Sequence, residues 1–88
     1  MPQIELTARF VAFYRALPPQ VRKKVDKAIA LLAENPRHPS LQAKPIQGTH
    51  GIYEARVDVH HRLTYERLAG DVLLLRAVGR HDETIEKP

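Results

Sequence analysis

The sequence contains no cysteine among its 88 residues. This absence excludes a disulfide framework and any metal site built on thiolates, and it fits the reducing cytoplasm, which is the location we expect. No apolar run approaches the roughly 20 residues that a membrane-spanning helix needs. Residues 1–5 also lack the basic and apolar regions of a signal peptide. We therefore expect no membrane partner.

A chain of this length is the size of one domain, so we expect residues 1–88 to form a single folded unit. Such a chain buries a modest core, which places function on a face or in a shallow groove. Fourteen Lys and Arg against ten Asp and Glu give a net charge of +4. This excess fits an RNA, DNA or acidic-protein partner, but it fits a merely soluble basic surface almost as well.

A short edge strand and a first helix are expected at the start of the chain. Residues 4–6 alternate between apolar and polar side chains. Thr7 suits the helix N-cap because its hydroxyl can accept from an unpaired amide of the first turn. Apolar residues then recur at helical spacing over residues 8–17, and Pro18-Pro19 ends this helix.

A second helix is predicted over residues 19–34, with a stripe of apolar side chains at steps of three and four. Its basic residues lie mostly off this stripe. Lys23 and Lys27 are therefore candidates for RNA binding, although a solvated face is the more usual explanation. Residues 37–50 are expected to form a partly extended connector that returns to the sheet, and its length suggests a role at the functional face.

Residues 51–81 contain three alternating apolar segments separated by polar breaks, the pattern of an antiparallel meander. Strict alternation predicts which side chains face the helices: Tyr53, Ala55, Val57, Val59, Leu63, Tyr65, Leu73, Leu75 and Ala77. Leu74 and Val78 are expected on the other side. The predicted fold class is α+β. It has two layers, with an N-terminal helical hairpin packed on a small, mainly antiparallel sheet in the order β-α-α-β-β-β, and room for a short C-terminal helix.

The other side of this sheet carries charges at close spacing. Glu54 and Arg56 are two residues apart on one strand, so they project from one face. Arg62 faces the same way on the next strand, and Arg76 is placed to join them. His81 follows where the third strand ends. The expected result is a polar face with arginines, a carboxylate and a histidine.

This mixture suits cleavage of RNA by its own 2′-hydroxyl, which needs a base, an acid and a cation for the phosphorane. Arg62 and Arg56 suit the cation because guanidinium binds phosphate oxygens in a bidentate manner. His81 suits the acid or base near neutral pH, and Glu54 is a candidate base. No metal or cofactor is expected, since the substrate supplies the nucleophile. The residues alone favour a simpler interpretation, a cross-strand salt bridge.

Four segments together resemble the RelE/ParE superfamily of toxin–antitoxin toxins: residues 17–25 (LPPQVRKKV), 51–57 (GIYEARV), 61–65 (HRLTY) and 78–83 (VGRHDE). The resemblance covers nearly the whole chain. It implies a toxin that is neutralised by a cognate antitoxin encoded beside it. Many members cut mRNA in the ribosomal A site, whereas ParE members inhibit DNA gyrase.

The resemblance also implies roles for individual residues. Arg62 matches the arginine that contacts the scissile phosphate in RelE-like nucleases. His81 falls near the catalytic histidine of YoeB- and YafQ-type members, and Glu54 and Arg56 stand where RelE has two lysines. RelE and YoeB end with a catalytic tyrosine and YafQ with a phenylalanine, whereas residues 82–88 here contain no aromatic side chain.

The principal hypothesis is therefore a ribosome-dependent, metal-independent mRNA endonuclease of a type II toxin–antitoxin system. The catalytic candidates are Arg62, His81, Arg56 and Glu54. The residues expected to bind RNA are Lys44, Arg80, Arg76, Lys23 and Lys27. The expected partners are the antitoxin and mRNA on the ribosome. Two alternatives remain: a ParE-type gyrase inhibitor without nuclease activity, and a non-toxic remnant that only binds its antitoxin.

Overall fold

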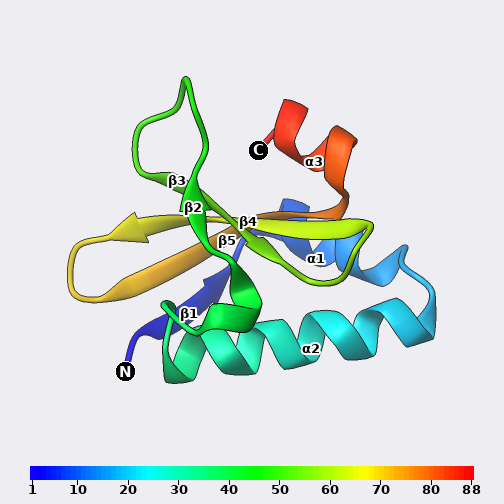
Figure 1. Ribbon diagram of the computed structural model, residues 1–88, viewed down its shortest axis with the longest axis horizontal. Coiled ribbons are helices and arrows are strands. Elements are labelled where there is room, and N and C mark those ends of the chain that lie inside the picture. Colours follow the sequence, from blue (N-terminus) through cyan, green and yellow to red (C-terminus); the bar gives the residue numbers. More distant parts are fainter.

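The computed structural model describes all residues, 1–88, and its elements follow the predicted order (Figure 1). They are β1 (Gln3–Leu6), α1 (Ala8–Arg15), α2 (Pro19–Glu34), the 3-10 helix η1 (Pro39–Leu41), β2 (Lys44–Pro45), β3 (Ile52–Arg56), β4 (His61–Leu68), β5 (Val72–Arg80) and α3 (His81–Glu86). The expected connector is thus interrupted by η1 and by β2. No helix is both long and apolar enough to cross a bilayer.

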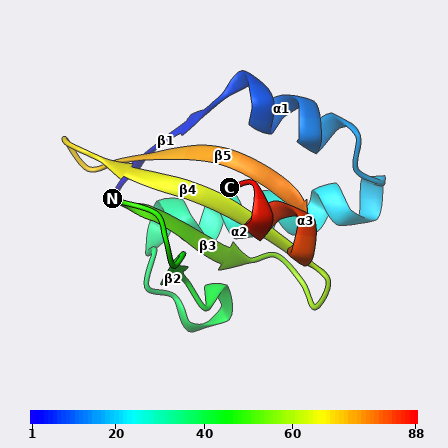
Figure 2. The ribbon, with the colours of Figure 1, turned by 90° about the horizontal axis from the view of Figure 1, so that it is seen from above.

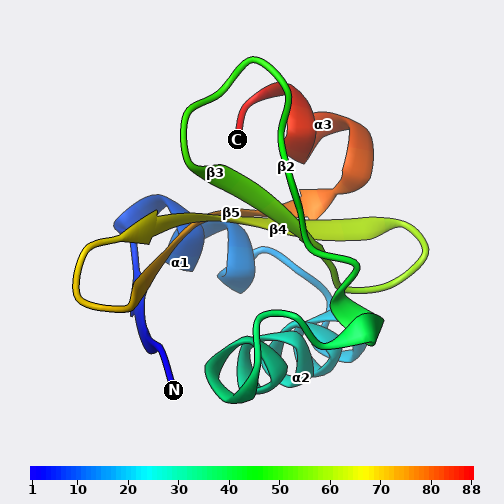
Figure 3. The same ribbon diagram turned by 60° about the vertical axis from the view of Figure 1, so that its left-hand side comes forward.

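The five strands form one sheet in the order β1-β5-β4-β3-β2. β1 runs parallel to β5, and all other neighbours are antiparallel, which confirms the mainly antiparallel α+β fold. α2 crosses one face of the sheet, with α1 beside β5 on the same side (Figures 1 and 3). α3 lies on the opposite face, above β4 and β5 (Figure 2).

The two long helices begin where the sequence predicts. The Thr7 hydroxyl accepts from the Phe10 amide at 3.0 Å, as an N-cap should, and it also donates to the Leu75 carbonyl at 2.9 Å. This second bond ties the start of α1 to β5. α1 ends at Arg15 rather than Leu17, because a residue that precedes proline is disfavoured in helical conformation.

A core of twelve buried residues lies between the helices and the sheet. α2 contributes Val21, Val25, Ala28 and Leu32 to it, the stripe that the sequence predicts. From the sheet come Ala55, Leu63, Tyr65, Leu73, Leu75 and Val78, with Tyr53 partly buried against them. The helix-facing side of the meander is therefore confirmed for most of its length.

A β-bulge makes two of the predicted orientations wrong. The pairing of β4 with β5 shifts by one residue next to the Thr64–Ala77 pair, which leaves Arg76 as an extra residue on β5. Such a bulge reverses the alternation beyond it. Val78, opposite Leu63, therefore joins the core at 2% exposure. Ala77 instead shares the face of Thr64, away from α2.

Val59 is the third misplaced residue. It was expected to face the helices, but β3 already ends at Arg56 and residues 57–60 form a turn. At the tip of this turn the Val59 side chain is 63% exposed. Alternation holds only while the strand continues, so the prediction failed where the strand stopped.

Candidate active site

Three ionisable side chains meet on the sheet face opposite α2, which we call the charged face. Glu54 comes from β3, Arg62 from β4 and His81 from the start of α3. Arg62 Nε lies 3.8 Å from Glu54 Oε1, and His81 Nε2 lies 3.9 Å from the same oxygen. The structure thus brings together three of the four residues predicted to be catalytic.

The three side chains differ in their access to solvent. Glu54 is 8% exposed, Arg62 17% and His81 47%. A buried carboxylate is costly unless cations or donors compensate it, and here Arg62 and His81 flank it. His81 is the most accessible of the three to a large substrate. Glu54 is placed to orient Arg62 and His81 rather than to touch the substrate.

The Arg62 guanidinium is held in one orientation by two backbone carbonyls. Its Nη1 donates to the carbonyl of Asp58 at 2.7 Å and to that of His61 at 3.0 Å. Guanidinium carries five N–H donors, so donors remain for an incoming anion after these bonds are made. Fixing the planar group in advance reduces the entropy lost when it binds a phosphate.

The β3–β4 turn that supplies these carbonyls is built around Asp58. Its Oδ1 accepts from the amides of His60 and His61, both at 2.8 Å, and contacts His61 Nδ1 at 2.9 Å. Lys24 Nζ lies 3.4 Å from Oδ2. Partial burial opposes ionisation of Asp58, but these hydrogen bonds and the His61 charge outweigh it and lower the pKa to about 2.

The lowered pKa of Asp58 predicts how stability changes in acid. An aspartate with a folded pKa below its unfolded value stabilises the fold while it is ionised. The contribution is full above about pH 4 and is lost as the pH falls through about 2. Urea unfolding of the wild type and of Asp58→Asn should therefore differ at pH 6 and converge towards pH 2.

An exposed carboxylate provides the control for this measurement. Glu34→Gln, at the exposed end of α2, should match the wild type across the whole range. A stability difference between Asp58→Asn and the wild type that stays constant from pH 6 to pH 2 would contradict the assignment. It would show that the side chain acts through shape rather than charge.

Arg56, the fourth predicted catalytic residue, forms no ion pair with this cluster and lies at its edge. It stands opposite Arg62 in the β3–β4 register, and like charges directly opposite are unfavourable. Arg56 lies on the edge that β2 leaves open. It lines a cavity of about 240 Å³ together with Lys24 and Lys27 of α2. By register Arg56 therefore shares the charged face with Arg62, and it also borders the basic side of α2.

Two of the residues expected to bind RNA are exposed beside the cluster. Lys44 is opposite Glu54 in the β2–β3 register, so both side chains project from the charged face. Arg80 directly precedes His81 and lines a small cavity of about 220 Å³ with it. Both are placed to contact a polyanion that reaches His81. Lys23, by contrast, is exposed on α2, on the far side of the sheet.

Arg76 is occupied by the chain's own C-terminus. Its Nη1 lies 2.9 Å from Glu66 Oε1, and its Nε donates to the Pro88 carbonyl oxygen at 3.2 Å. The buried Thr64 hydroxyl donates to the same oxygen at 3.1 Å. The tail after α3 is thus fastened onto the charged face. Sequence reasoning missed both this anchor and the role of Asp58. The only sequence signal for the role of Asp58 is its position two residues before a backbone amide in a turn, to which an aspartate side chain can bond.

The chain matches the family model described as ParE toxin of type II toxin–antitoxin system, parDE, over residues 4–85. Among solved structures it is similar to YafQ from E. coli strain BL21(DE3), with a TM-score of 0.74, 22% identity, and coverage of 94% of this chain and 97% of that one. It is similar to a YoeB/ParE toxin from Agrobacterium tumefaciens, with a TM-score of 0.75, 18% identity, and coverage of 90% and 98%.

A chain of the intact E. coli RelBE toxin–antitoxin complex is also similar, with a TM-score of 0.73 and 20% identity over 92% of this chain and 98% of that one. At these identities the structural likeness establishes a shared fold alone. None of the curated proteins matches the sequence.

Proposed function

This chain belongs to the RelE/ParE superfamily of type II toxin–antitoxin toxins, and we propose that it is a ribosome-dependent mRNA endonuclease. One observation carries the proposal: Glu54, Arg62 and His81 converge within 4 Å on the charged face. Arg80 and Lys44 are exposed on either side of this cluster. A cation fixed beside an accessible histidine suits chemistry on a phosphodiester.

In this mechanism the 2′-hydroxyl oxygen of the RNA attacks the adjacent phosphorus, and the bond from phosphorus to the 5′-oxygen breaks. Arg62 stabilises the charge that builds on the phosphorane oxygens. His81 takes the 2′-hydroxyl proton, and the leaving 5′-oxygen takes one from solvent. The products are a 2′,3′-cyclic phosphate and a free 5′-hydroxyl. We assign Glu54 a positioning role, because its buried carboxylate lies within 4 Å of both Arg62 Nε and His81 Nε2.

A ParE-type gyrase inhibitor is the second candidate, and two observations favour it. The family model that matches the chain is that of ParE toxins. The C-terminal residues 82–88 contain no aromatic side chain, the group with which RelE-like nucleases complete their site. A remnant that keeps only antitoxin binding is the third candidate.

One pair of assays separates these candidates. Purified protein is incubated with programmed ribosomes and mRNA, and DNA gyrase supercoiling is measured in parallel. The proposal predicts mRNA cut at the A-site codon, with 5′-hydroxyl ends, and unaffected supercoiling. Intact mRNA together with inhibited supercoiling would establish the gyrase candidate instead. Inactivity in both assays would support the third candidate, a remnant that only binds its antitoxin.

We also propose that a cognate antitoxin neutralises this protein. Solved relatives include toxin–antitoxin complexes such as RelBE from E. coli and RelB–RelE from Methanococcus jannaschii. The basic charge of this chain suits an acidic, amphipathic segment that is disordered alone and folds on binding. A small neighbouring reading frame with a DNA-binding N-terminus and an acidic tail would support this partner.

A further inference from the structure

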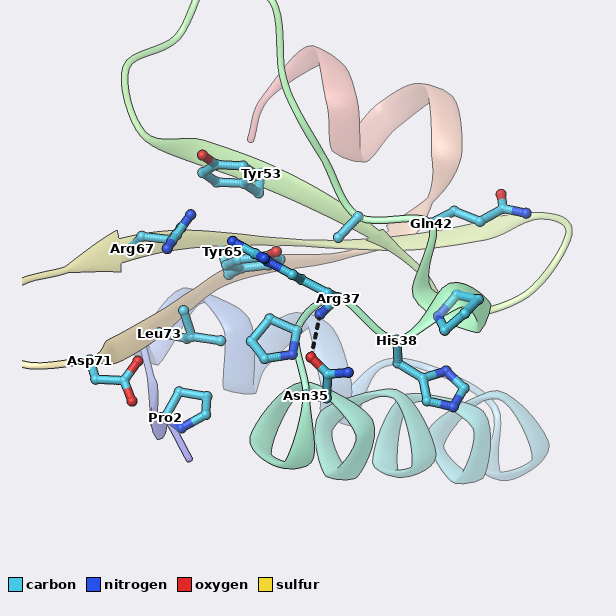
Figure 4. Close-up of a pocket in the computed structure, with 13 residues that line it drawn as sticks. Pro2, Asn35, Arg37, His38, Gln42, Tyr53, Tyr65, Arg67, Asp71 and Leu73 are labelled. Carbon is cyan, nitrogen blue, oxygen red and sulfur yellow. Dashed lines mark hydrogen bonds between the residues drawn. The ribbon is translucent and has the colours of Figure 1, made fainter.

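A second polar cleft lies on the helix-facing side of the sheet, away from the Glu54–Arg62–His81 cluster (Figure 4). Its volume is about 520 Å³, within the range of about 300–1,000 Å³ that is usual for ligand sites. The loop that follows α2 forms one wall, and β3, β4 and the start of β5 form the other. Arg37 reaches into the cleft from the loop and Arg67 from β4, and the two side chains point towards one another.

Arg67 is held on an aromatic platform. Its guanidinium carbon lies 5.5 Å from the centre of the Tyr53 ring. Tyr53 in turn stacks on the buried Tyr65, with 5.5 Å between ring centres and 14° between planes. Stacking engages the face of a guanidinium and leaves the N–H groups on its edge free. Those edge donors are the ones that bind an oxyanion in a bidentate manner.

Arg37 is fixed through its backbone. The Arg37 amide donates to Asn35 Oδ1 at 3.0 Å, and the His38 amide donates to the Asn35 carbonyl at 2.9 Å. Pro36 and Pro39 further restrict the loop. The guanidinium is nevertheless exposed and projects into open space. The loop therefore presents its cation at a defined point of the cleft wall.

The cleft is positively charged because neither arginine is neutralised. No carboxylate lies within ion-pair distance of Arg37 or Arg67. The one acidic residue in the lining, Asp71, sits at the rim with a side chain that is 70% exposed, and it pairs with the N-terminal ammonium at 4.0 Å. Two unpaired guanidinium groups facing one another repel in the absence of an anion.

We propose that this cleft binds a phosphate of an RNA backbone, at a site separate from the scissile phosphate. A phosphate presents oxygens in several directions, so it can accept from Arg37 on one wall and Arg67 on the other. A carboxylate offers two oxygens in one plane, which suits one fork better than two opposed ones. The inference rests on the proposed function only in taking RNA as the polyanion.

The test measures binding of a short single-stranded 2′-O-methyl RNA by fluorescence anisotropy at several salt concentrations. This RNA lacks the attacking hydroxyl, so binding is measured without cleavage. Each phosphate contact contributes about 0.7 to the slope of log K against log salt for single strands. Arg37→Gln and Arg67→Gln should each weaken binding and reduce the slope by about 0.7. Arg67→Lys should also weaken binding, because the charge is kept but the stacked fork is lost.

Arg15→Gln supplies the matched control, since it removes one exposed arginine at the end of α1, outside both sites. Equal slopes for Arg15→Gln, Arg37→Gln and Arg67→Gln would overturn the proposal. Tighter binding of a polyglutamate peptide, lost in the same two cleft variants, would also overturn it in favour of an acidic protein partner. Thermal unfolding of each variant confirms that the fold is retained.

These outcomes are independent of the nuclease assay. If the wild type cuts no mRNA on ribosomes, yet the cleft variants show the reduced salt slopes, the proposed catalytic function is wrong and the proposed phosphate site in the cleft is supported. If the wild type cuts mRNA, but the cleft variants have the same salt slope as Arg15→Gln, the catalytic function is supported and the phosphate site in the cleft is wrong.

Discussion

His81→Ala is expected to slow ribosome-dependent mRNA cleavage by about 10²–10⁴-fold, the usual contribution of a general acid or base. His81 is the accessible titratable side chain of the cluster, with Nε2 3.9 Å from the buried Glu54 carboxylate. Removing the imidazole leaves Arg62 in place, so substrate binding should change much less than the cleavage step. Single-turnover cleavage on programmed ribosomes measures this, and growth arrest on expression should be relieved.

His50→Ala is the control for this experiment. His50 is exposed in the segment between β2 and β3 and forms no side-chain hydrogen bond or ion pair. Its variant should cleave at the wild-type rate, and both histidine variants should unfold at the wild-type temperature. Should His81→Ala cut as fast as His50→Ala, the acid–base role of the charged face is wrong.

Arg62→Ala is expected to suppress cleavage as well, but it needs a companion variant. Arg62 also holds the carbonyls of Asp58 and His61, so its loss loosens the β3–β4 turn. Arg62→Lys keeps the charge and loses the bidentate fork, and we expect it to retain only part of the activity. Intermediate activity with wild-type stability would separate a role at the phosphate from a role in the turn.

The helices were predictable because their signals are local. Pro19 opens α2 and Asn35-Pro36 closes it, and the apolar stripe between them contacts the core as expected. It was also predictable that Glu54 and Arg62 project from the same face of the sheet. Side chains alternate between faces along each strand, and a single tight turn joins the two strands. Each of these inferences needs only a few neighbouring residues.

The features that were missed depend on contacts between distant segments. The bulge beside Thr64 is a property of how β4 pairs with β5, and neither strand reveals it alone. The hydrogen bond from Arg76 to Pro88 joins residues that are twelve positions apart. The helix between them was predicted only as a short C-terminal helix without firm bounds. In both cases tertiary pairing overrides a local pattern.

The bulge can be tested directly, because it assigns Val78 to the core. Val78 is 2% exposed, opposite the fully buried Leu63. Val78→Lys would place an ammonium group there without a partner, which typically costs on the order of 3–5 kcal/mol. Domains of this kind have about 5–15 kcal/mol of total stability, so the variant should be largely unfolded or unfold at much lower urea. Chemical denaturation followed by circular dichroism measures the loss.

Leu74→Lys distinguishes the bulge from strict alternation. Without the bulge, Leu74 and Val78 would share a face, and their lysine variants would behave alike. In the structure Leu74 lies opposite Glu66 on the charged face and is only half-buried. A lysine there can reach water and the Glu66 carboxylate, so we expect a loss of about 1 kcal/mol or less. Comparable losses in the two variants would mean that the strands pair without the bulge, and that Val78 and Ala77 exchange the faces assigned to them.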